Sequence, residues 1–325
     1  MAEPTDAVVR VRVAAICASD LHFLHGKAPL DPGEGMGHEA VGVVESVGSE
    51  VRRIRPGDRV VAAFHVACGR CWFCARGQTH LCEDWRMLGA GLFGGELGGA
   101  QAELVRVPRA DVNLLRLPDE LDDERAVFLG DVLTTGYHGA AVAGIEPGDT
   151  VAVVGAGPVG LCCVASAPLF GAAEVLALDR VPERLALAER FGGRPVDVTR
   201  QHPNTAVSER TGGRGADVVI EAVGSPEGLA TALDVVRRGG RITVVGVFTS
   251  ETLPVQIGVW WTRGLSVRLT GICPVHARWD AVLREVLAGR LDPRPLVSHR
   301  LPLEEAPLGY ELFRARRATK VLLLP

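Results

Sequence analysis

Four cysteines in one short segment are the feature that most constrains the fold of this chain. They are Cys68, Cys71, Cys74 and Cys82, with the spacing C-x2-C-x2-C-x7-C. Zinc in structural sites favours a closed tetrahedron of thiolates, and closely spaced cysteines in a tight turn can reach one ion. Disulfides or chance spacing are the alternatives, and the density of the motif disfavours both. We therefore predict a structural zinc site without an open coordination position, with the metal as the main source of order in this loop.

Composition and charge narrow the class of protein. The chain has 325 residues, of which 47% are hydrophobic, which is enough for about two domains with sizeable cores. The formal net charge is -4 and no long basic run occurs, which argues against nucleic acid as the main partner. The N-terminal segment lacks the apolar core of a signal peptide, and no apolar run is long enough for a membrane span. Eight cysteines in such a chain indicate thiols and metal ligands, so we expect a cytoplasmic protein.

The pattern of the chain changes near residue 145. Before it, short β-branched runs such as VVRVRVAA, EAVGVVESVG and DRVVAAF alternate with glycine and proline, which predicts a β-rich domain. After it, strand-like segments such as TVAVVG, EVLALD and ADVVIEAVG alternate with helical ones, which predicts βαβ units and a parallel sheet. The C-terminal segment returns to helices and short strands. We expect three segments with boundaries at 1–134, 135–273 and 274–325, the last returning to the first domain.

A glycine motif opens the alternating half. Residues Gly155, Gly157, Pro158, Val159 and Gly160 belong to GAGPVG, which fits G-x-G-x-x-G and directly follows the strand-like TVAVV. The first glycine permits the tight turn, the second lets a pyrophosphate approach the backbone, and the third allows close helix packing. The N–H groups of the following helix then face the phosphates. This context predicts a dinucleotide-binding site.

The acid that follows this motif bears on the choice of cofactor. Asp179 ends the next strand-like segment, about 20 residues later, where a carboxylate can bind ribose hydroxyls. It would repel a 2′-phosphate, so we expect NAD rather than NADP, although the adjacent Arg180 weakens that preference. The alternative role for Asp179 is a helix N-cap.

A third group of residues is dispersed along the chain. Cys17 lies in ICASDLH, His38 and Glu39 in GMGHEAVG, and Asp131 in FLGDVLTTGYHG. A catalytic zinc needs about three protein ligands and an open position. Each residue also has an ordinary explanation, as a core cysteine, a buried histidine or a helix cap. Spacing alone leaves the two interpretations about even.

Several motifs together resemble those of the medium-chain zinc-dependent alcohol dehydrogenases. They are ICASDLH, GHEAVGVVESVG, PGDRVV, the cysteine loop, TTGYHGA and GAGPVGL, and the resemblance runs from about Val8 to the C-terminus. It implies an α/β fold in which a GroES-like β-rich catalytic domain is interrupted by a Rossmann domain with a doubly wound parallel sheet.

The resemblance also implies a catalytic zinc in addition to the structural one. Cys17 and His38 match two of its ligands. The third position, often cysteine, is occupied by Asp131, as in a branch similar to glutathione-independent formaldehyde dehydrogenases. Glu39 matches a glutamate near the zinc that can enter its coordination sphere. Asp20 matches a residue that orients the ligand histidine.

The implied reaction is hydride transfer between an alcohol, aldehyde or ketone and NAD. Ser19 resembles the hydroxyl that accepts the alcohol proton, and His22 resembles the histidine that passes it to solvent. A turn-forming serine and a surface histidine are the alternatives. Thr135 matches a residue that contacts the nicotinamide. Arg184 matches a basic residue near the adenosine ribose, with a solvated helix charge as its alternative.

Two further expectations concern an edge of the sheet and the oligomeric state. The family usually has another strand pair before the segment matching VVRVRVAAIC, so we expect an exposed sheet edge or a more open substrate cleft there. We also expect a homodimer or homotetramer. An aldehyde dismutase that retains NAD and a non-catalytic cofactor-binding protein are the alternatives to an alcohol dehydrogenase.

Overall fold

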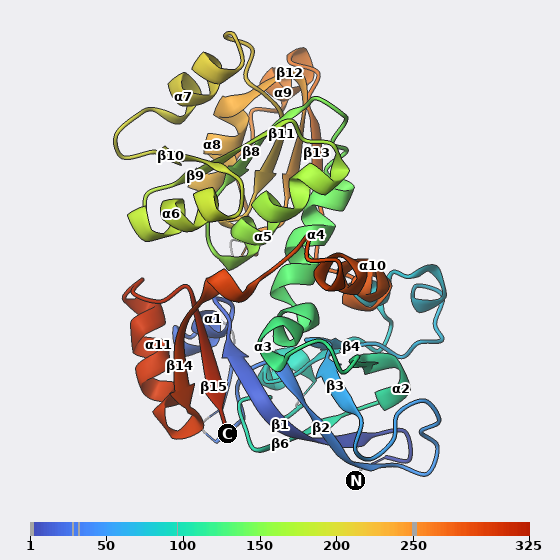
Figure 1. The fold of residues 1–325 in the computed structure, drawn as a ribbon. Helices are drawn as coiled ribbons and strands as arrows, with labels where there is room; N and C mark the ends of the chain where they lie inside the picture. Colours follow the sequence, from blue (N-terminus) through green and yellow to red (C-terminus); the bar gives the residue numbers. More distant parts are fainter. Residues whose placement is uncertain (1–2, 28, 32, 96, 249–251) are drawn as a thin grey trace. The chain divides into compact units, whose positions relative to one another are not determined.

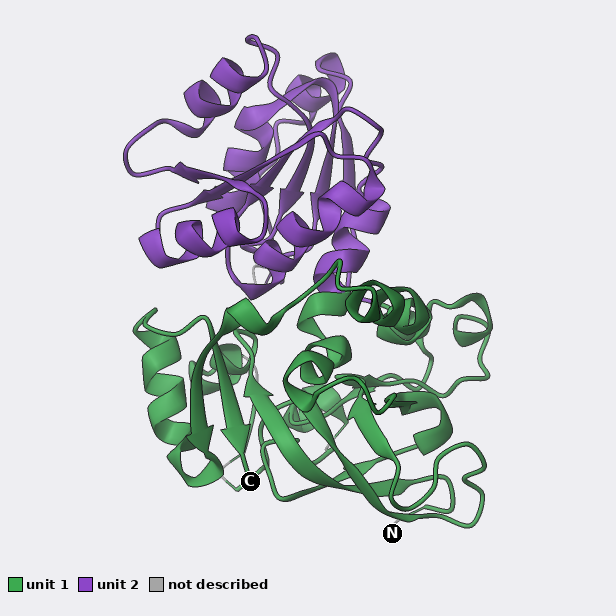
Figure 2. Ribbon diagram, viewed as in Figure 1, with its two compact units in different colours: residues 1–134, 274–325 green, residues 135–273 purple. Residues whose placement is uncertain are grey.

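The computed structural model describes residues 3–27, 29–31, 33–95, 97–248 and 252–325. The chain divides into two compact units, one formed by residues 1–134 with 274–325 and the other by residues 135–273 (Figure 2). Each unit has its own sheet.

The first unit is built on a mostly antiparallel sheet of short, β-branched strands. Its strand order is β14-β15-β1-β2-β3-β7, with β6 also paired to β1. The strands are β1 (Ala7–Ile16), β2 (Glu39–Val47), β3 (Arg59–Ala62), β6 (Leu104–Val107), β7 (Leu114–Arg116), β14 (Val297–Pro302) and β15 (Lys320–Leu324). A small second sheet joins β4 (His65–Val66) and β5 (Arg86–Met87).

Both sides of β1 are covered, so the expected exposed edge is wrong. One side of β1 pairs with β2. On the other side, β6 pairs with residues 7–10 and β15 pairs with residues 14–16. Strands that are distant in sequence, β6 and β15, therefore pair with the side of β1 that was expected to be exposed. This pairing satisfies the backbone N–H and C=O groups of that side.

Short helices complete the first unit. They are α1 (Asp20–Leu24), α2 (Ala110–Asn113), α3 (Asp123–Ala126), α10 (Val275–Leu287) and α11 (Ala306–Arg314). The helix α11 lies against β14 and β15 (Figure 1), and its Phe313 joins the core formed by β1, β2 and β15. Gly309 allows this close approach, since a Cβ atom there would lie 2.7 Å from Ile16 Cδ1.

The second unit is a doubly wound parallel sheet with the order β10-β9-β8-β11-β12-β13. Its strands are β8 (Thr150–Val154), β9 (Glu174–Asp179), β10 (Arg194–Asp197), β11 (Ala216–Glu221), β12 (Val236–Val244) and β13 (Ser266–Leu269). The central strands are buried on both faces, as the continuous apolar runs TVAVV and EVLALD predict. The β-rich first domain and the doubly wound parallel sheet of the second, both expected from the sequence, are confirmed.

Helices cover both faces of this sheet (Figure 1). Helices that contact its strands include α5 (Pro158–Ser166), α6 (Pro182–Arg190) and α8 (Pro226–Val235). The unit also contains α7 (Pro203–Arg210), α9 (Ile257–Thr262) and the part of α4 (Val132–Val142) that begins at Thr135. The helices α7 and α8 share a core with alternate strand residues such as Val154 and Leu178. The helices α4 and α5 approach closely at Gly136, where a Cβ atom would lie 2.3 Å from Cys162 Cβ. Cys162 is therefore a packing residue.

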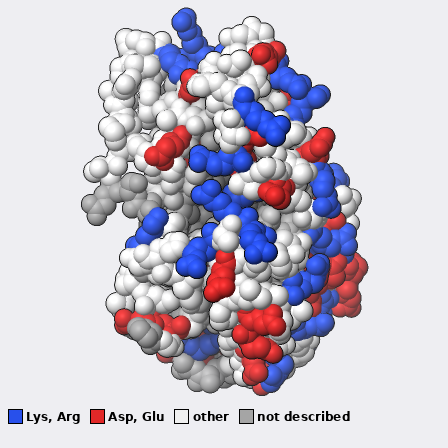
Figure 3. Space-filling view, turned by 90° about the vertical axis from the view of Figure 1, so that its left-hand side faces the viewer, with Lys and Arg blue, Asp and Glu red and all other residues white. Residues whose placement is uncertain are grey.

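The surface carries many charged side chains of both signs. On the face drawn in Figure 3, basic and acidic side chains are interspersed. Exposed ion pairs of the second unit include Arg194–Glu174 at 2.6 Å and Arg210–Glu174 at 3.4 Å. Such pairs contribute only about 0–1 kcal/mol each, so they serve solubility more than stability.

Candidate functional site

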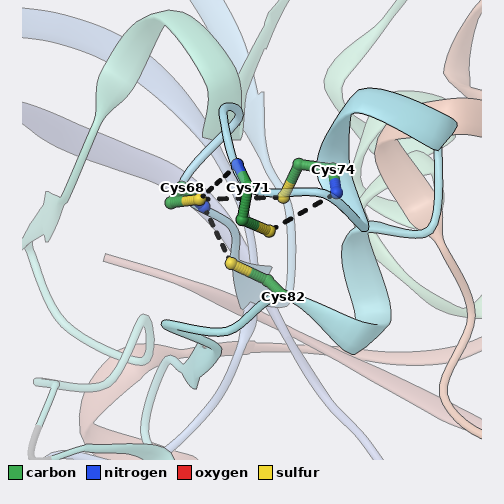
Figure 4. A group of neighbouring side chains, drawn as sticks. All are labelled: Cys68, Cys71, Cys74 and Cys82. Atoms are coloured by element: carbon green, nitrogen blue, oxygen red, sulfur yellow. Dashed lines mark hydrogen bonds between the residues drawn. The ribbon is translucent and has the colours of Figure 1, made fainter.

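The four cysteines of the loop converge on one point. One sulfur atom from each of Cys68, Cys71, Cys74 and Cys82 lies within 4.8 Å of all the others (Figure 4). Cys68 Sγ and Cys74 Sγ are 3.9 Å apart, which is too far for a disulfide bond. The set of four thiols at this separation has the donors and the size that tetrahedral zinc requires.

Backbone N–H groups support thiolates at this point. The N–H of Cys68 donates to Cys82 Sγ at 3.1 Å, and the N–H of Cys71 donates to Cys68 Sγ at 3.3 Å (Figure 4). Hydrogen bonds from the N–H groups of Cys74 and Glu83 lower the pKa of Cys71 to about 6. Burial instead raises the pKa of Cys82, and it raises the pKa of Cys74 to about 12. The backbone thus favours the thiolate, the form that binds metal, at Cys71, and a cation would be needed to hold all four sulfur atoms in that form.

The loop also has an anchor that the sequence did not reveal. Asn113, fully buried at the end of α2, accepts from Ala67 N at 2.8 Å and donates to the carbonyl of Ala67 at 3.1 Å. His276 of α10 lies 2.9 Å from Asn113 Oδ1 and 3.0 Å from Thr79 Oγ1. The metal is therefore not the only source of order in this segment.

A second group of metal-binding side chains lies elsewhere in the first unit. One donor atom from each of Cys17, His38, Glu39 and Asp131 lies within 4.8 Å of the others. Asp131 Oδ2 is 3.3 Å from His38 Nε2 and 3.7 Å from Cys17 Sγ. All four residues are less than one tenth exposed. The dispersed residues noted in the sequence are thus brought together in one buried cluster.

Strand register explains this convergence. Cys17 follows the last residue of β1, and Glu39 begins β2, which pairs with β1 through Ala15. Asp131 immediately precedes α4, with an irregular backbone at φ -152° and ψ -86°. A mixed set of thiolate, imidazole and carboxylate suits zinc.

A buried carboxylate orients the histidine. Asp20 Oδ1 lies 3.2 Å from His38 Nδ1, which leaves Nε2 facing Asp131. Asp20 Oδ2 accepts from Cys17 N at 2.9 Å and from Gln101 Nε2 at 3.2 Å. A partner on one ring nitrogen presents the other to a metal, so the structure places Asp20 where such an orienting role requires it.

The pKa of His38 reflects these neighbours. Burial lowers the pKa, but Asp20 and Asp131 outweigh that effect and hold it well above the usual value for histidine. The anionic surroundings therefore favour a positive charge at this point, which a metal cation supplies.

The two residues expected to carry protons lie at the start of α1, shortly after Cys17 in the sequence. Ser19 Oγ is 3.4 Å from His38 Nε2, and its side chain makes no capping bond to α1. His22 lies one turn later, half-buried, and its N–H donates to the carbonyl of Ser19 at 3.0 Å. Burial, with Lys27 and His25 nearby, lowers the pKa of His22.

One charged residue in this cluster was missed by the sequence analysis. Lys320 begins β15, is fully buried, and forms an ion pair with Glu39 Oε1. Burial lowers the pKa of Lys320, but Glu39 and then Cys17 outweigh it and raise the pKa above its usual value. The available signal was a lysine at the head of the apolar strand KVLLL. Only the pairing of β15 with β1 shows that the ammonium group of Lys320 is buried.

The glycine motif of the second unit has the geometry of a phosphate-binding turn. Gly155 has φ +92°, and a Cβ atom on Gly160 would lie 1.9 Å from the carbonyl oxygen of Gly155. Gly157 is the N-cap of α5, and Pro158 and Val159 form its first turn. Side chains at the first and third glycines would therefore block the turn or its packing, and the turn leads directly into the N-terminus of α5.

Asp179 is held in place at the end of β9. Its Oδ2 accepts from Ala156 N at 2.7 Å, and its Oδ1 accepts from Arg180 N at 2.7 Å and from Val181 N at 3.0 Å. The N-cap of α6 is Val181, so Asp179 is not itself the cap. The carboxylate thus ties the strand end to the glycine turn. Its two oxygens have further acceptor capacity for a ligand.

The other residues expected near the cofactor belong to the same unit. Arg184 Nη1 lies 3.8 Å from Asp179 Oδ2, so it adds positive charge next to the carboxylate. Arg180 follows Asp179 directly and is exposed. Thr135 lies in α4 and is half-buried.

Comparison with known proteins places these features in one family. Residues 3–119 match the alcohol dehydrogenase GroES-like domain, and residues 158–288 match the zinc-binding dehydrogenase domain. Over 314 residues the chain is 40% identical to a probable zinc-binding alcohol dehydrogenase of Mycobacterium tuberculosis, covering 96% of this chain and 80% of the relative. The chain belongs to the medium-chain zinc-dependent alcohol dehydrogenase family. This dehydrogenase is accordingly an oxidoreductase.

Solved structures of relatives agree. The dehydrogenase is 48% identical to the alcohol dehydrogenase TADH from Thermus sp. ATN1, with a TM-score of 0.95, covering 100% of this chain and 93% of the other. A putative zinc-binding dehydrogenase from Sinorhizobium meliloti, solved with NADP, is 32% identical with a TM-score of 0.88, covering 100% of this chain and 93% of the other. In the described part of the dehydrogenase, no helix combines the length and apolar character of a membrane span.

Proposed function

We propose that this dehydrogenase transfers hydride between NAD and an alcohol, with an aldehyde or ketone as the oxidised partner. The observation that supports this most directly is the buried cluster of Cys17, His38 and Asp131, whose donor atoms lie within 4.8 Å of one another and of Glu39. Four donors of this chemistry fit zinc, and a buried anionic cluster without a cation would be costly. We assign Cys17, His38 and Asp131 as the ligands of a catalytic zinc.

A zinc ion in this cluster would act as a Lewis acid that lowers the pKa of the substrate hydroxyl. Oxidation removes one proton from that hydroxyl and one hydride from its carbon, and the nicotinamide accepts the hydride. We assign Ser19, whose Oγ is 3.4 Å from His38 Nε2, as the group that accepts this proton and releases its own. His22, one helical turn later, is the proposed carrier to solvent, and burial, with Lys27 and His25 nearby, lowers its pKa and so favours the neutral imidazole. Asp20 fixes the orientation of His38 during these steps.

The choice of NAD rests on the carboxylate at the end of β9. We propose that Asp179 accepts hydrogen bonds from the ribose hydroxyls of NAD and repels the additional phosphate of NADP. Three backbone N–H groups fix its orientation, so it cannot easily turn away from a ligand. Arg180 and Arg184 lie beside it and reduce the discrimination. The glycine turn before α5 would hold the pyrophosphate.

We further propose that this dehydrogenase is a homo-oligomer assembled through the edge of the second unit. β13 pairs with β12 on one side, and no described strand pairs with its other side. Leu269 on β13 is 74% exposed, and Trp261 of α9 is 81% exposed. Large apolar side chains beside an unpaired strand are typical of association surfaces. Sedimentation should give a dimer or tetramer, and Leu269→Glu should shift it toward the monomer.

The decisive experiment for the activity is a substrate and cofactor screen. Purified holoenzyme is assayed for NAD and NADP reduction with primary, secondary, aromatic and polyol alcohols, and for the reverse reaction with the matching carbonyl compounds. We expect oxidation of at least one alcohol class with a higher kcat/KM for NAD. The Cys17→Ser variant is the matched control, since it keeps the fold but weakens the proposed catalytic site. Equal turnover by wild type and Cys17→Ser would overturn the assignment.

A further inference from the structure

The buried pair of Lys320 and Glu39 has no role in the reaction as described so far. Both side chains are 0% exposed, and Lys320 Nζ donates to Glu39 Oε1. Removing two charges from water costs several kcal/mol per ion, so a buried ion pair is weak evidence for a stabilising role. A hydrophobic pair would serve stability at least as well, which directs attention to the neighbouring metal cluster.

The sheet delivers Lys320 to this cluster. In the antiparallel pair of β1 and β15, Ile16 faces Val321, so the next residues at this end are Cys17 and Lys320. Ala15 on the opposite side of β1 faces Glu39. Three adjacent strands therefore bring a thiol, a carboxylate and an ammonium group to the same end of the sheet.

Charge balance gives the lysine a specific role. The cluster offers three side chains that bind metal as anions, from Cys17, Asp131 and Glu39, together with the neutral imidazole of His38. A divalent metal balances two of these anions. Lys320, paired with Glu39, balances the third, while Asp20, a further buried carboxylate that is not among these donors, lies against the other ring nitrogen of His38. If Lys320 were neutral or missing, the metal would be the only cation beside the Glu39 carboxylate.

The two oxygens of Glu39 are not equivalent. Oε1 is held by Lys320, whereas Oε2 is buried and has no hydrogen-bond partner among the described residues. One carboxylate oxygen of Glu39 is already within 4.8 Å of the donor atoms of the other three residues. A metal held by the other three donor atoms would therefore have the Glu39 carboxylate as a near neighbour, and the same carboxylate is paired with Lys320.

We propose that Lys320 is a positioning residue that holds Glu39 away from the catalytic metal and so keeps one coordination position open for the substrate oxygen. This inference rests on the proposed function, because it takes Cys17, His38 and Asp131 as the resident ligands. Without Lys320, Glu39 occupies the open position and competes with substrate. Arginine at the same place would preserve the charge and the pairing.

The test uses holoenzyme in which Co²⁺ replaces zinc in the catalytic site, because the visible absorption of Co²⁺ weakens when coordination rises from four to five ligands. The variants are Lys320→Met, Lys320→Arg, Glu39→Gln and the double variant Lys320→Met/Glu39→Gln. Elemental analysis first establishes that each folded variant holds two metals per chain. We expect weakened bands for Lys320→Met, restored bands for the double variant, and wild-type bands for Lys320→Arg and Glu39→Gln.

Kinetics supply a second readout on the zinc enzyme. If Glu39 occupies the open position in nine molecules of ten, only about one tenth remains competent, and KM for the alcohol rises about tenfold while kcat changes less. The double variant should recover most of that loss in KM. A defect in folding or packing would instead lower the amount of active enzyme and leave KM unchanged.

Two results would overturn the proposal. One is a folded, fully loaded Lys320→Met variant with the absorption spectrum and KM of the wild type. The other, which remains accessible if Lys320→Met fails to fold, is a Glu39→Gln spectrum that indicates fewer ligands than in wild type, since Glu39 would then already bind the metal. Failure of the proposed function is separate, because it would show as wild-type holoenzyme that reduces no NAD with any alcohol, whatever the spectra.

Discussion

His276 donates from Nε2 to Asn113 Oδ1 at 2.9 Å and so links α10, near the end of the chain, to the loop that carries the four cysteines. Asn113 Oδ1 can only accept, so Nε2 carries a proton, and Nδ1 lies 3.0 Å from the Thr79 hydroxyl, which can donate to it. Burial holds the pKa of His276 well below its usual value, which favours the neutral imidazole. The cysteine loop contains two 3₁₀ turns and little other regular structure. Asn113 holds it at Ala67 and His276 holds it at Thr79.

We predict that Asn113→Ala strongly destabilises the first unit. The change removes the partners of Ala67 N and of the carbonyls of Ala67 and Pro108, all in a buried place. Each buried polar group left without a partner costs about 1–3 kcal/mol, so the free energy of unfolding should fall by several kcal/mol. Denaturant unfolding measures this, with Asn204→Ala on α7 as the control, because the half-buried Asn204 donates only one hydrogen bond to a backbone carbonyl, that of Asp234. A loss below about 1 kcal/mol would show that water replaces the side chain.

The stability of the protein should fall below about pH 6.5 because of His276. Burial, with a smaller effect of His65, holds the pKa of His276 well below the usual histidine value. Between the folded and the unfolded pKa of His276, the unfolded chain binds a proton that the folded protein does not. The free energy of unfolding therefore rises with pH over this range, and the contribution of His276 is fully present above its unfolded pKa. The slope attributable to one histidine is at most about 1.4 kcal/mol per pH unit.

The matched control for this pH dependence is His276→Gln, which keeps a polar side chain but does not titrate. Its unfolding free energy should depend less on pH between about 5 and 6.5 than that of the wild type. Parallel curves for the two proteins over this range would contradict the assigned cause.

The cysteine loop should hold one of two zinc ions per chain. Cys71→Ser removes one of four ligands whose sulfur atoms lie within 4.8 Å of one another, so that variant should retain only the other ion and lose stability or assembly. Elemental analysis of fresh protein, together with thermal unfolding, measures both effects. Active wild-type protein without zinc would refute the prediction.

Asp131 and His22 should behave differently on substitution. Asp131→Ala removes a metal ligand and should abolish turnover, whereas NAD binding by the second unit should be largely unchanged, because all its assigned residues lie in 135–273. Equilibrium binding of NAD, metal content and kcat/KM separate these effects. Two retained zinc ions with near-normal activity would make Glu39 the leading candidate for the third ligand.

His22→Ala should keep both metals and lose only part of the activity. General acid–base groups contribute ~10²–10⁴-fold, and a half-exposed carrier should lie at or below that range because water can replace it. The loss should be greatest at low pH, where removing the alcohol proton is hardest. A pH–rate profile with the same shape in both proteins would exclude His22 from the proton path.

Cofactor preference should depend on Asp179. Asp179→Gly removes the carboxylate that repels a 2′-phosphate. It also removes the partner that lies 3.8 Å from Arg184 Nη1, so the Arg184 guanidinium can attract that phosphate. The ratio of kcat/KM for NAD over NADP should narrow or reverse. A wild-type enzyme that already prefers NADP would contradict the role of Asp179, and Asp179→Glu is the control that retains the charge.

Local patterns in the sequence were sufficient for the features whose parts lie close together in the chain. The C-x2-C-x2-C-x7-C loop, the G-x-G-x-x-G turn before α5, and the alternation of apolar strands with helices in residues 150–244 all depend on spacing of a few residues, which backbone geometry converts directly into structure. The exposed edge expected beside β1 was wrong because its cover, β15, comes from the other end of the chain.

Contacts between distant residues were decided only by the tertiary structure. Cys17 and Asp131 are 114 positions apart, Asn113 and His276 are 163 apart, and Glu39 and Lys320 are 281 apart. Spacing carries no information about such pairs, since they depend on which strands are neighbours and on their register. The register of β15, β1 and β2 places Lys320, Cys17 and Glu39 together, and a shift of one residue would turn each side chain to the opposite face of the sheet.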